Sequence, residues 1–403
     1  MKLRLAILTV AGISIAGSCM AQPQKLWGVR MAETVMKIYP DSIVVKRAGE
    51  LVANRPARWD YEQGVVLKAF DQLGAYTHDK SYMQYAKKII DHFVNADGSI
   101  RTYDLLEYNI DHVTPGRVVL ALYRETGEEK YKKAADLLHE QLNWQPRTKE
   151  GGFWHKHRYP YQMWLDGLYM GEPFSAEYAQ LFHQDKNFDD IINQFVWMEK
   201  HVRDAKTGLL YHAWDESKKQ RWADPATGHA PGFWGRGMGW YAMALVDVLD
   251  YIPANHPRRK EMIAILQRLG TALKNYQDPA SGVWYQVVDK ATTQGNYLEA
   301  SASCMFVYAL AKGSRLGYLD KSYSALAKKG FDGILKNFIE TDQQGLVHLT
   351  KTVSVGGLGG TPYRDGSFEY YISEPLRTDD LKGIGPFIQA SIEMDLLTPI
   401  HKP

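Results

Sequence analysis

The sequence has little cysteine: among its 403 residues only Cys19 and Cys304 are cysteines. Cys19 lies in the N-terminal stretch, which reads as an export signal, so the remaining chain has no partner for a disulfide. Cys304 stands in the apolar segment "SASCMFVYAL". A buried small hydrophobe is the better prediction for Cys304 than a nucleophile.

The chain also lacks a strong charge of one sign, since its formal net charge is only +2. A net charge this small excludes a charge-driven role in binding nucleic acid or an anionic membrane. An acidic ligand would therefore need cations gathered locally in its site. The sequence predicts no nucleic-acid partner.

Long apolar runs are missing after the N-terminus, and we expect no membrane-spanning segment. The first residues, "MKLRLAILTVAGISIAGSCMAQ", combine two early basic residues, a short apolar stretch and small residues. This pattern predicts a signal peptide over residues 1–21. Cleavage before Cys19 would instead leave a cysteine for lipid attachment. We expect a bacterial protein that is exported and is either periplasmic or lipid-anchored.

Several motifs are absent, and each absence removes a class of site. There is no HExxH or CxxC spacing, no phosphate-binding GxxxxGK[ST] and no GxSxG, so we predict no metal and no cofactor. The glycine-rich "VGGLGGTPYRDGS" stands outside a strand-to-helix context. We therefore reject it as a phosphate loop.

What the chain does contain is a helical repeat, which recurs roughly every 50 to 70 residues. Each unit pairs a helix that is apolar nearly all round with an amphipathic one, which predicts inner and outer helices. Six such hairpins give an all-α (α/α)6 barrel, closed by packing of the chain ends. The strand-like pieces "LLYHAWD", "GVWYQVVD" and "GLVHLTKTV" predict short β-hairpins at one rim. An open solenoid is the alternative. No linker divides residues 22–403, so we expect a single domain.

In such a ring every inner helix starts at the same mouth, and the residues at those starts converge. They include Asp60, Asp111 and Asp166, each of which could simply cap a helix. Asp166 fits a cap least well, because "YQMWLDGLYMGEPF" surrounds it with apolar residues. Burial there should raise the pKa of Asp166, as a general acid requires.

Aromatic residues form 12% of the chain, with 25 tyrosines and 11 tryptophans. Rings at the mouth, Trp164 among them, together with Arg236 predict a cleft for an acidic sugar, in which the guanidinium pairs with a carboxylate. A structural ion pair is an equally good reading of Arg236. His155 and His212 are weak candidates from composition, because a lone His is more often structural than catalytic.

Five motifs together carry a resemblance to a known family. In chain order they are "YQMWLDGLYMGEPF", "HAWDE", "GFWGRGMGWY", "GTPYRDGSFEYYISEP" and "LKGIGPFIQA". They resemble glycoside hydrolase family 105, the unsaturated rhamnogalacturonyl hydrolases, from about Trp59 to the C-terminus. The resemblance implies an (α/α)6 barrel that removes a 4,5-unsaturated uronic acid from the non-reducing end of lyase-generated oligosaccharides.

The resemblance also implies the chemistry, which is hydration of the C4=C5 enol ether rather than displacement at the anomeric carbon. Asp166 would match the catalytic acid and Asp111 the second carboxylate. The residues that would match the substrate pocket are His155, His212, Trp234, Arg236 and Trp240, joined by Trp59, Tyr61 and Met170.

Three other functions stay open at this point. The sister family of unsaturated glucuronyl hydrolases, acting on glycosaminoglycan fragments, shares fold and chemistry. A sugar epimerase or isomerase would rely on His155 and His212 instead of Asp166. A non-catalytic glycan-binding protein would need the rings and Arg236 but no acid. The aglycone, the origin of the uronate and the oligomeric state are also open.

Overall fold

The computed structural model describes residues 25–44 and 56–397. The expected signal peptide and Cys19 lie outside the described residues. Cys304 is fully buried.

Six long helices of the described chain form an inner ring: α2 (Tyr61–Thr77), α4 (Gly116–Thr126), α6 (Leu165–Leu181), α8 (Gly235–Val248), α10 (Ala300–Arg315) and α13 (Leu381–Leu397). Each inner helix packs against the next, and α13 contacts both α10 and α2, which closes the ring. In α8 every residue is buried, which explains why its sequence is apolar nearly all round.

Six further helices lie outside this ring: α1 (Trp27–Ile38), α3 (Ser81–Asp91), α5 (Glu129–Trp144), α7 (Phe188–Val202), α9 (Arg259–Tyr276) and α11 (Tyr323–Phe338). They are amphipathic; in α3, for example, Tyr85 and Ile89 are buried while Lys87 and Lys88 face outward. A short helix, α12 (Phe368–Ser373), precedes α13. The predicted (α/α)6 barrel is confirmed.

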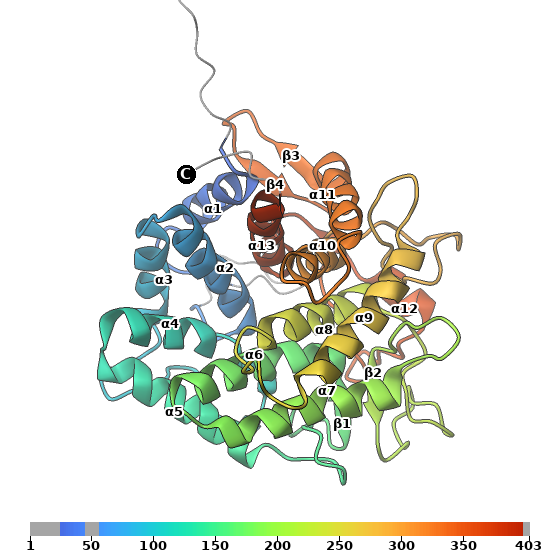
Figure 1. The fold of residues 1–403 in the computed structure, drawn as a ribbon, viewed down its shortest axis with the longest axis horizontal. Coiled ribbons are helices and arrows are strands. Elements are labelled where there is room, and N and C mark those ends of the chain that lie inside the picture. Colours follow the sequence, from blue (N-terminus) through green and yellow to red (C-terminus); the bar gives the residue numbers. More distant parts are fainter. Residues whose placement is uncertain (1–24, 45–55, 398–403) are drawn as a thin grey trace, which may run out of the picture.

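The two ends of the described chain meet, as Figure 1 shows for blue α1 and red α13. The backbone N–H of Gly28 donates to Oγ of Ser391 at 2.8 Å. On the other side of α13, Gly385 lies against α2, where a Cβ would stand 2.7 Å from Cγ1 and 2.9 Å from the carbonyl oxygen of Val65. Close approach of this kind requires glycine.

The small strands differ from the expected hairpins. β1 (Gln162–Trp164) pairs with distant β2 (Ala213–Asp215), and β5 (Thr352–Val353) with β6 (Leu376–Arg377). Among the described residues, only β3 (Ile339–Thr341) and β4 (Val347–Leu349) form a local hairpin. The segment "GVWYQVVD", expected to be strand-like, forms no strand. Its N–H groups bond to separate partners, Gln286 to Tyr297 and Val288 to Phe233, so no continuous ladder forms.

A buried ionic cluster ties three inner helices together. Asp247 of α8 accepts from Nη1 of Arg117 at 2.9 Å, from Nζ of Lys312 at 2.8 Å and from the Tyr308 hydroxyl at 2.6 Å. Burial alone would raise the pKa of Asp247, but Lys312 and Arg117 hold it below its usual range. The buried charge of Asp247 is thus paired with two cations, which offsets the cost of its burial.

Candidate active site

A pocket of about 200 Å³ opens where inner helices begin. It is lined by Tyr61, Asp111, His155, Lys156, Arg158, Tyr159, Trp164, Asp166, Met170, Trp234, Arg236, Trp240, Val355, Gly356, Gly357 and Arg364. Two carboxylates and four cationic side chains share this space with five large rings. An anionic ligand with apolar faces fits that combination.

Asp166 is the second residue of α6 and lies inside the helix, so it is not the cap. The helix is positioned by strand β1 and by the N–H of Leu165, which donates to the carbonyl of His212 at 3.0 Å. Oδ1 of Asp166 is buried and has no hydrogen-bond partner among the described residues. Burial raises the pKa of Asp166, and the charge of Asp111 adds to the rise.

Asp111, unlike Asp166, has cationic and hydrogen-bonding partners for its carboxylate. It lies in a 3-10 turn, Ile110–Val113, immediately before α4. Nζ of Lys156 pairs with its Oδ2, and Nε2 of His155 lies 3.2 Å from its Oδ1. Burial alone would raise the pKa of Asp111, but Lys156 and His155 hold it well below its usual range. Asp111 is therefore a fixed anion at neutral pH.

Stacked rings form one wall of the pocket. Trp164 lies parallel to His155, with ring centroids 4.9 Å apart, and to Tyr159 at 5.0 Å. Trp240 packs on Tyr169 of α6 at 4.7 Å. Flat aromatic faces of this kind suit the C–H faces of a sugar ring.

Arg236 is buried at the start of α8. Its Nη1 donates to the carbonyl of Val353 and, at 3.4 Å, to Oγ of Ser301, while Nε has no partner. No carboxylate of the described residues forms an ion pair with Arg236, so the structural ion pair considered above is absent there. The guanidinium is therefore able to pair with an anionic ligand.

Comparison with known proteins fits this geometry. The chain matches the family described as Glycosyl Hydrolase Family 88 over residues 27–398. A glycoside hydrolase of family 105 from C. acetobutylicum ATCC 824 superimposes with a TM-score of 0.87 at 47% identity, covering 92% of this chain and 100% of that one. The chain belongs to glycoside hydrolase family 88/105.

Two more relatives of this family 88/105 hydrolase are informative. The unsaturated rhamnogalacturonyl hydrolase YesR of Bacillus subtilis is 28% identical over 305 residues, 73% of this chain and 83% of YesR. A structure of an unsaturated glucuronyl hydrolase specific for heparin has a TM-score of 0.67 at 16% identity, covering 93% of this chain and 96% of its own. The latter likeness shows the shared fold alone.

The pocket of the family 88/105 hydrolase brings together eight of the ten residues predicted for its site, and two lie elsewhere. Trp59 is 1% exposed, and its Nε1 donates to the carbonyl of His112 at 2.7 Å. His212 is fully buried beside Trp164 and Trp234, and its Nδ1 lies 2.8 Å from the Tyr371 hydroxyl. Neither lines the pocket. Asp60, also noted at the mouth, caps α2 through the N–H of Glu62.

Sequence reasoning missed part of the lining. The missed residues are Lys156, Arg158, Tyr159, Val355, Gly356, Gly357 and Arg364, while Trp164 was noted only as a ring at the mouth. Lys156 follows His155 directly in "WHKHRYP", and Arg364 lies within a motif already quoted. The expected need for local cations was a signal that could have pointed to both.

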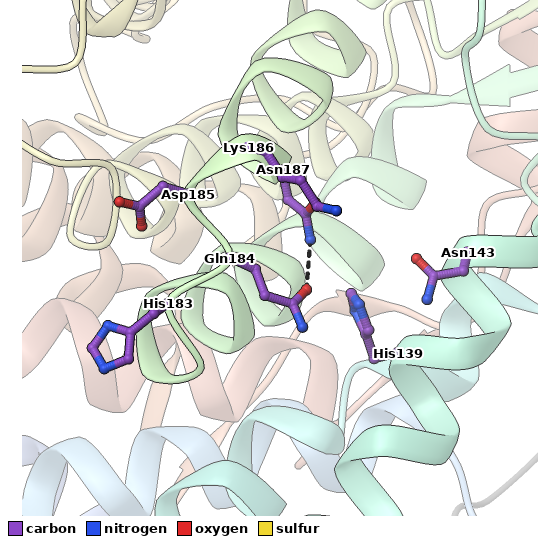
Figure 2. Close-up of a pocket in the computed structure, with 7 residues that line it drawn as sticks. All are labelled: His139, Asn143, His183, Gln184, Asp185, Lys186 and Asn187. Carbon is purple, nitrogen blue, oxygen red and sulfur yellow. Dashed lines mark hydrogen bonds between the residues drawn. The ribbon is translucent and has the colours of Figure 1, made fainter.

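A second, larger hollow of about 720 Å³ lies away from this pocket, between α5 and the segment after α6. Figure 2 shows His139 and Asn143 facing Gln184 and Asn187. Nδ2 of Asn187 donates to Oε1 of Gln184 at 2.9 Å. Asp185 is the only carboxylate in its lining. The paired carboxylates of the first pocket have no counterpart here.

Metal-binding clusters and membrane-spanning helices are both absent from the part of the chain that the structure describes. No cluster of three or more His, Cys, Asp or Glu side chains within residues 25–44 and 56–397 is arranged to hold a metal ion. No helix in the same ranges has the length and apolar character needed to cross a membrane.

Proposed function

We propose that this glycoside hydrolase removes a 4,5-unsaturated uronic acid from the non-reducing end of oligosaccharides left by a polysaccharide lyase, by hydrating the C4=C5 enol ether. The observation that carries the proposal is Asp166: a carboxyl group with a raised pKa and a free oxygen, facing a cationic, aromatic pocket. An alkene needs such an acid, because its carbon is a weak base.

The reaction balances with one carboxyl group and one water molecule. Asp166 gives its proton to C4, and positive charge develops at C5 and the ring oxygen. Water adds at C5 and returns a proton to Asp166. The resulting hemiketal opens to a ketone at C5 and a hemiacetal at C1. The hemiacetal then collapses to an aldehyde and releases the rest of the oligosaccharide as an alcohol. Asp111, a fixed anion nearby, stabilises the developing positive charge. Burial, with a smaller contribution from the charge of Asp111, keeps the pKa of Asp166 high.

The acidic group of the sugar is recognised by the cations of the pocket. Arg236 is the strongest candidate, because its charge lacks a carboxylate partner and Nε is unpaired. Lys156 is already engaged by Asp111, and Nε of Arg364 donates to the carbonyl of Gly359 at 3.0 Å. We expect Arg236 to bind the uronate carboxylate.

A rhamnogalacturonan-type substrate is supported by the similarity to YesR, whose name states that activity. The alternative is a glycosaminoglycan-type fragment, which the fold alone cannot separate from it. The deciding experiment incubates purified protein with lyase-digested rhamnogalacturonan and, separately, with lyase-digested glycosaminoglycan. Loss of the ultraviolet absorbance of the conjugated alkene on the first substrate supports the proposal. Loss on the second alone assigns the enzyme to the alternative, and loss on neither rejects hydration.

We also propose export, on the composition of residues 1–21. Mass spectrometry of the protein recovered from a bacterial host identifies its N-terminal residue and so tests export. A mature chain that starts at Gln22 supports a periplasmic protein, and a lipid-modified Cys19 supports an anchored one. An intact Met1 contradicts export.

A further inference from the structure

A third, very small cavity adjoins the active-site pocket and shares His155 and Trp164 with its lining. Its volume is about 10 Å³, and its lining is apolar except for His155, Glu172 and Gln194. A cavity of roughly 10 to 15 Å³ holds one water molecule if polar partners are present.

Glu172 is the unexpected member of this lining. It lies on α6, is 1% exposed, and its Oε1 is buried without a hydrogen-bond partner among the described residues. Burial raises the pKa of Glu172 well above its usual range, which favours the neutral carboxylic acid. A buried carboxyl oxygen without a hydrogen bond costs free energy, so Oε1 of Glu172 needs a hydrogen-bond partner.

Gln194 does not supply that partner, because both ends of its amide are used. Its Oε1 accepts from the N–H of Phe153 at 2.9 Å, and its Nε2 donates to the carbonyl of Gly151 at 3.1 Å. The unsatisfied polar groups at the cavity are therefore Glu172 and His155.

His155 is satisfied on one side only. Its Nε2 faces the Asp111 carboxylate at 3.2 Å, which favours a proton on Nε2. Its Nδ1 is buried without a partner and borders the cavity. Gly167 leaves this edge of the ring open, since a Cβ there would stand 2.8 Å from Nδ1. With the proton on Nε2, Nδ1 is an acceptor and needs a donor.

We propose that Glu172 is a positioning residue, which holds Nδ1 of His155 through one buried water molecule and so keeps Nε2–H directed at Asp111. The hydroxyl of neutral Glu172 donates to the water, and the water donates to Nδ1. This chain fixes the imidazole as a donor to Asp111, whose charge in turn acts on Asp166. The effect on catalysis rests on the proposed function, but the effect on the histidine does not.

The first test therefore needs no substrate. Nitrogen-15 NMR of histidine-labelled wild-type protein at neutral pH, with His155 assigned by its loss in His155→Asn, reports which ring nitrogen carries the proton. We expect His155 as the single Nε2–H tautomer with Nδ1 accepting a hydrogen bond. A proton on Nδ1, or a mixture of tautomers, overturns the proposal even if the enzyme is active.

Variants of Glu172 supply the second test. Glu172→Gln keeps a donor for the water and should retain the tautomer and kcat. Glu172→Met removes it and should give a tautomer mixture, with kcat lowered about two- to tenfold and KM little changed, as for one lost hydrogen bond. The matched control Leu168→Met changes the same lining without touching a polar group, and should behave as wild type.

A purely structural role for Glu172 gives a different result. In that case Glu172→Met folds and melts normally but leaves the His155 signals and kcat unchanged, which refutes the proposal. If Glu172→Met does not fold, the wild-type NMR result still decides. If the wild type has the expected tautomer but hydrates no unsaturated substrate, the proposed function fails and the role of Glu172 stands.

Discussion

Nε2 of His155 lies 3.2 Å from Oδ1 of Asp111, while Lys156 pairs with the other oxygen of that carboxylate. Asp166 faces the same pocket without such partners. The two carboxyl groups therefore differ in their ionisation: the pKa of Asp111 lies below its usual range and that of Asp166 above it. Divergent pKa values of this kind separate the acid from the supporting anion.

Replacing Lys156 by Met tests the pairing of Asp111. Because the folded-state pKa of Asp111 is depressed, the pair stabilises the protein at pH values above the usual Asp range and ceases to do so as pH falls through the folded-state pKa. Lys156→Met should therefore lower the melting temperature at neutral pH and approach wild type in acid. Calorimetry across pH measures this difference. A deficit that is constant with pH would show that Lys156 does not act through Asp111.

Replacing Arg236 by Lys tests carboxylate recognition. Lysine keeps the charge but loses the planar fork, so kcat/KM should fall about ten- to hundredfold, mainly through KM. The control is a substrate whose uronate is a methyl ester. Wild type should bind the methyl ester more weakly than the acid. Arg236→Lys should bind the ester about as weakly as wild type does, because the contact that the substitution weakens is already lost. Equal penalties of the substitution on acid and ester would place the carboxylate elsewhere in the pocket.

Replacing Gly385 by Ala tests closure of the ring. The new methyl group would meet Val65 of α2, including its backbone oxygen, and should destabilise the fold by about 1–3 kcal/mol in chemical denaturation. Gly270→Ala on outer helix α9 is the matched control. A Cβ there meets only the ends of the Leu319 and Tyr323 side chains, at 3.3 Å or more, and alanine favours the helix. Comparable stability of both variants would contradict tight packing between α13 and α2.

Replacing Asp247 by Asn tests the buried ionic cluster. Arg117 and Lys312 would lose their shared anion while remaining buried, which should cost about 3–5 kcal/mol of unfolding free energy. Asp332→Asn, which removes an exposed pair with Lys328, should change little. Urea unfolding of both variants measures the contrast. A small loss for Asp247→Asn would mean that water reaches the cluster.

Much of the fold follows from sequence because helix burial follows a local period. Most inner helices, such as α13, are apolar nearly all round and the outer ones, such as α1, are amphipathic, and this pattern predicts the ring and the packing of the two chain ends. The strand expected over "GVWYQVVD" fails for a non-local reason: its hydrogen bonds go to Phe233 and Tyr297, which no local pattern reveals.

The site was predictable where a motif lies at an inner-helix start, as for Asp166 and Arg236. The site was less predictable where the direction of a side chain decides whether the residue lines the pocket. Trp59 occupies such a start, yet its ring turns inward against Phe93. Lys156 and Asp111 are 45 residues apart in sequence, so their pairing depends on the fold. Glu172 stands in the same apolar motif as Asp166, but its burial was not predicted, because a glutamate in a helix is ordinarily exposed.

The central claim is that Asp166 protonates C4 of an unsaturated uronate. Its most direct test is turnover of a lyase-generated oligosaccharide in D₂O, followed by mass spectrometry and NMR of the products at the earliest times, before exchange beside the ketone. We expect wild type to place one deuterium at C4 as alkene absorbance disappears, and Asp166→Asn to be slower by about 10²–10⁴. Release of a uronate that keeps its double bond, with no deuterium at C4, would contradict the claim.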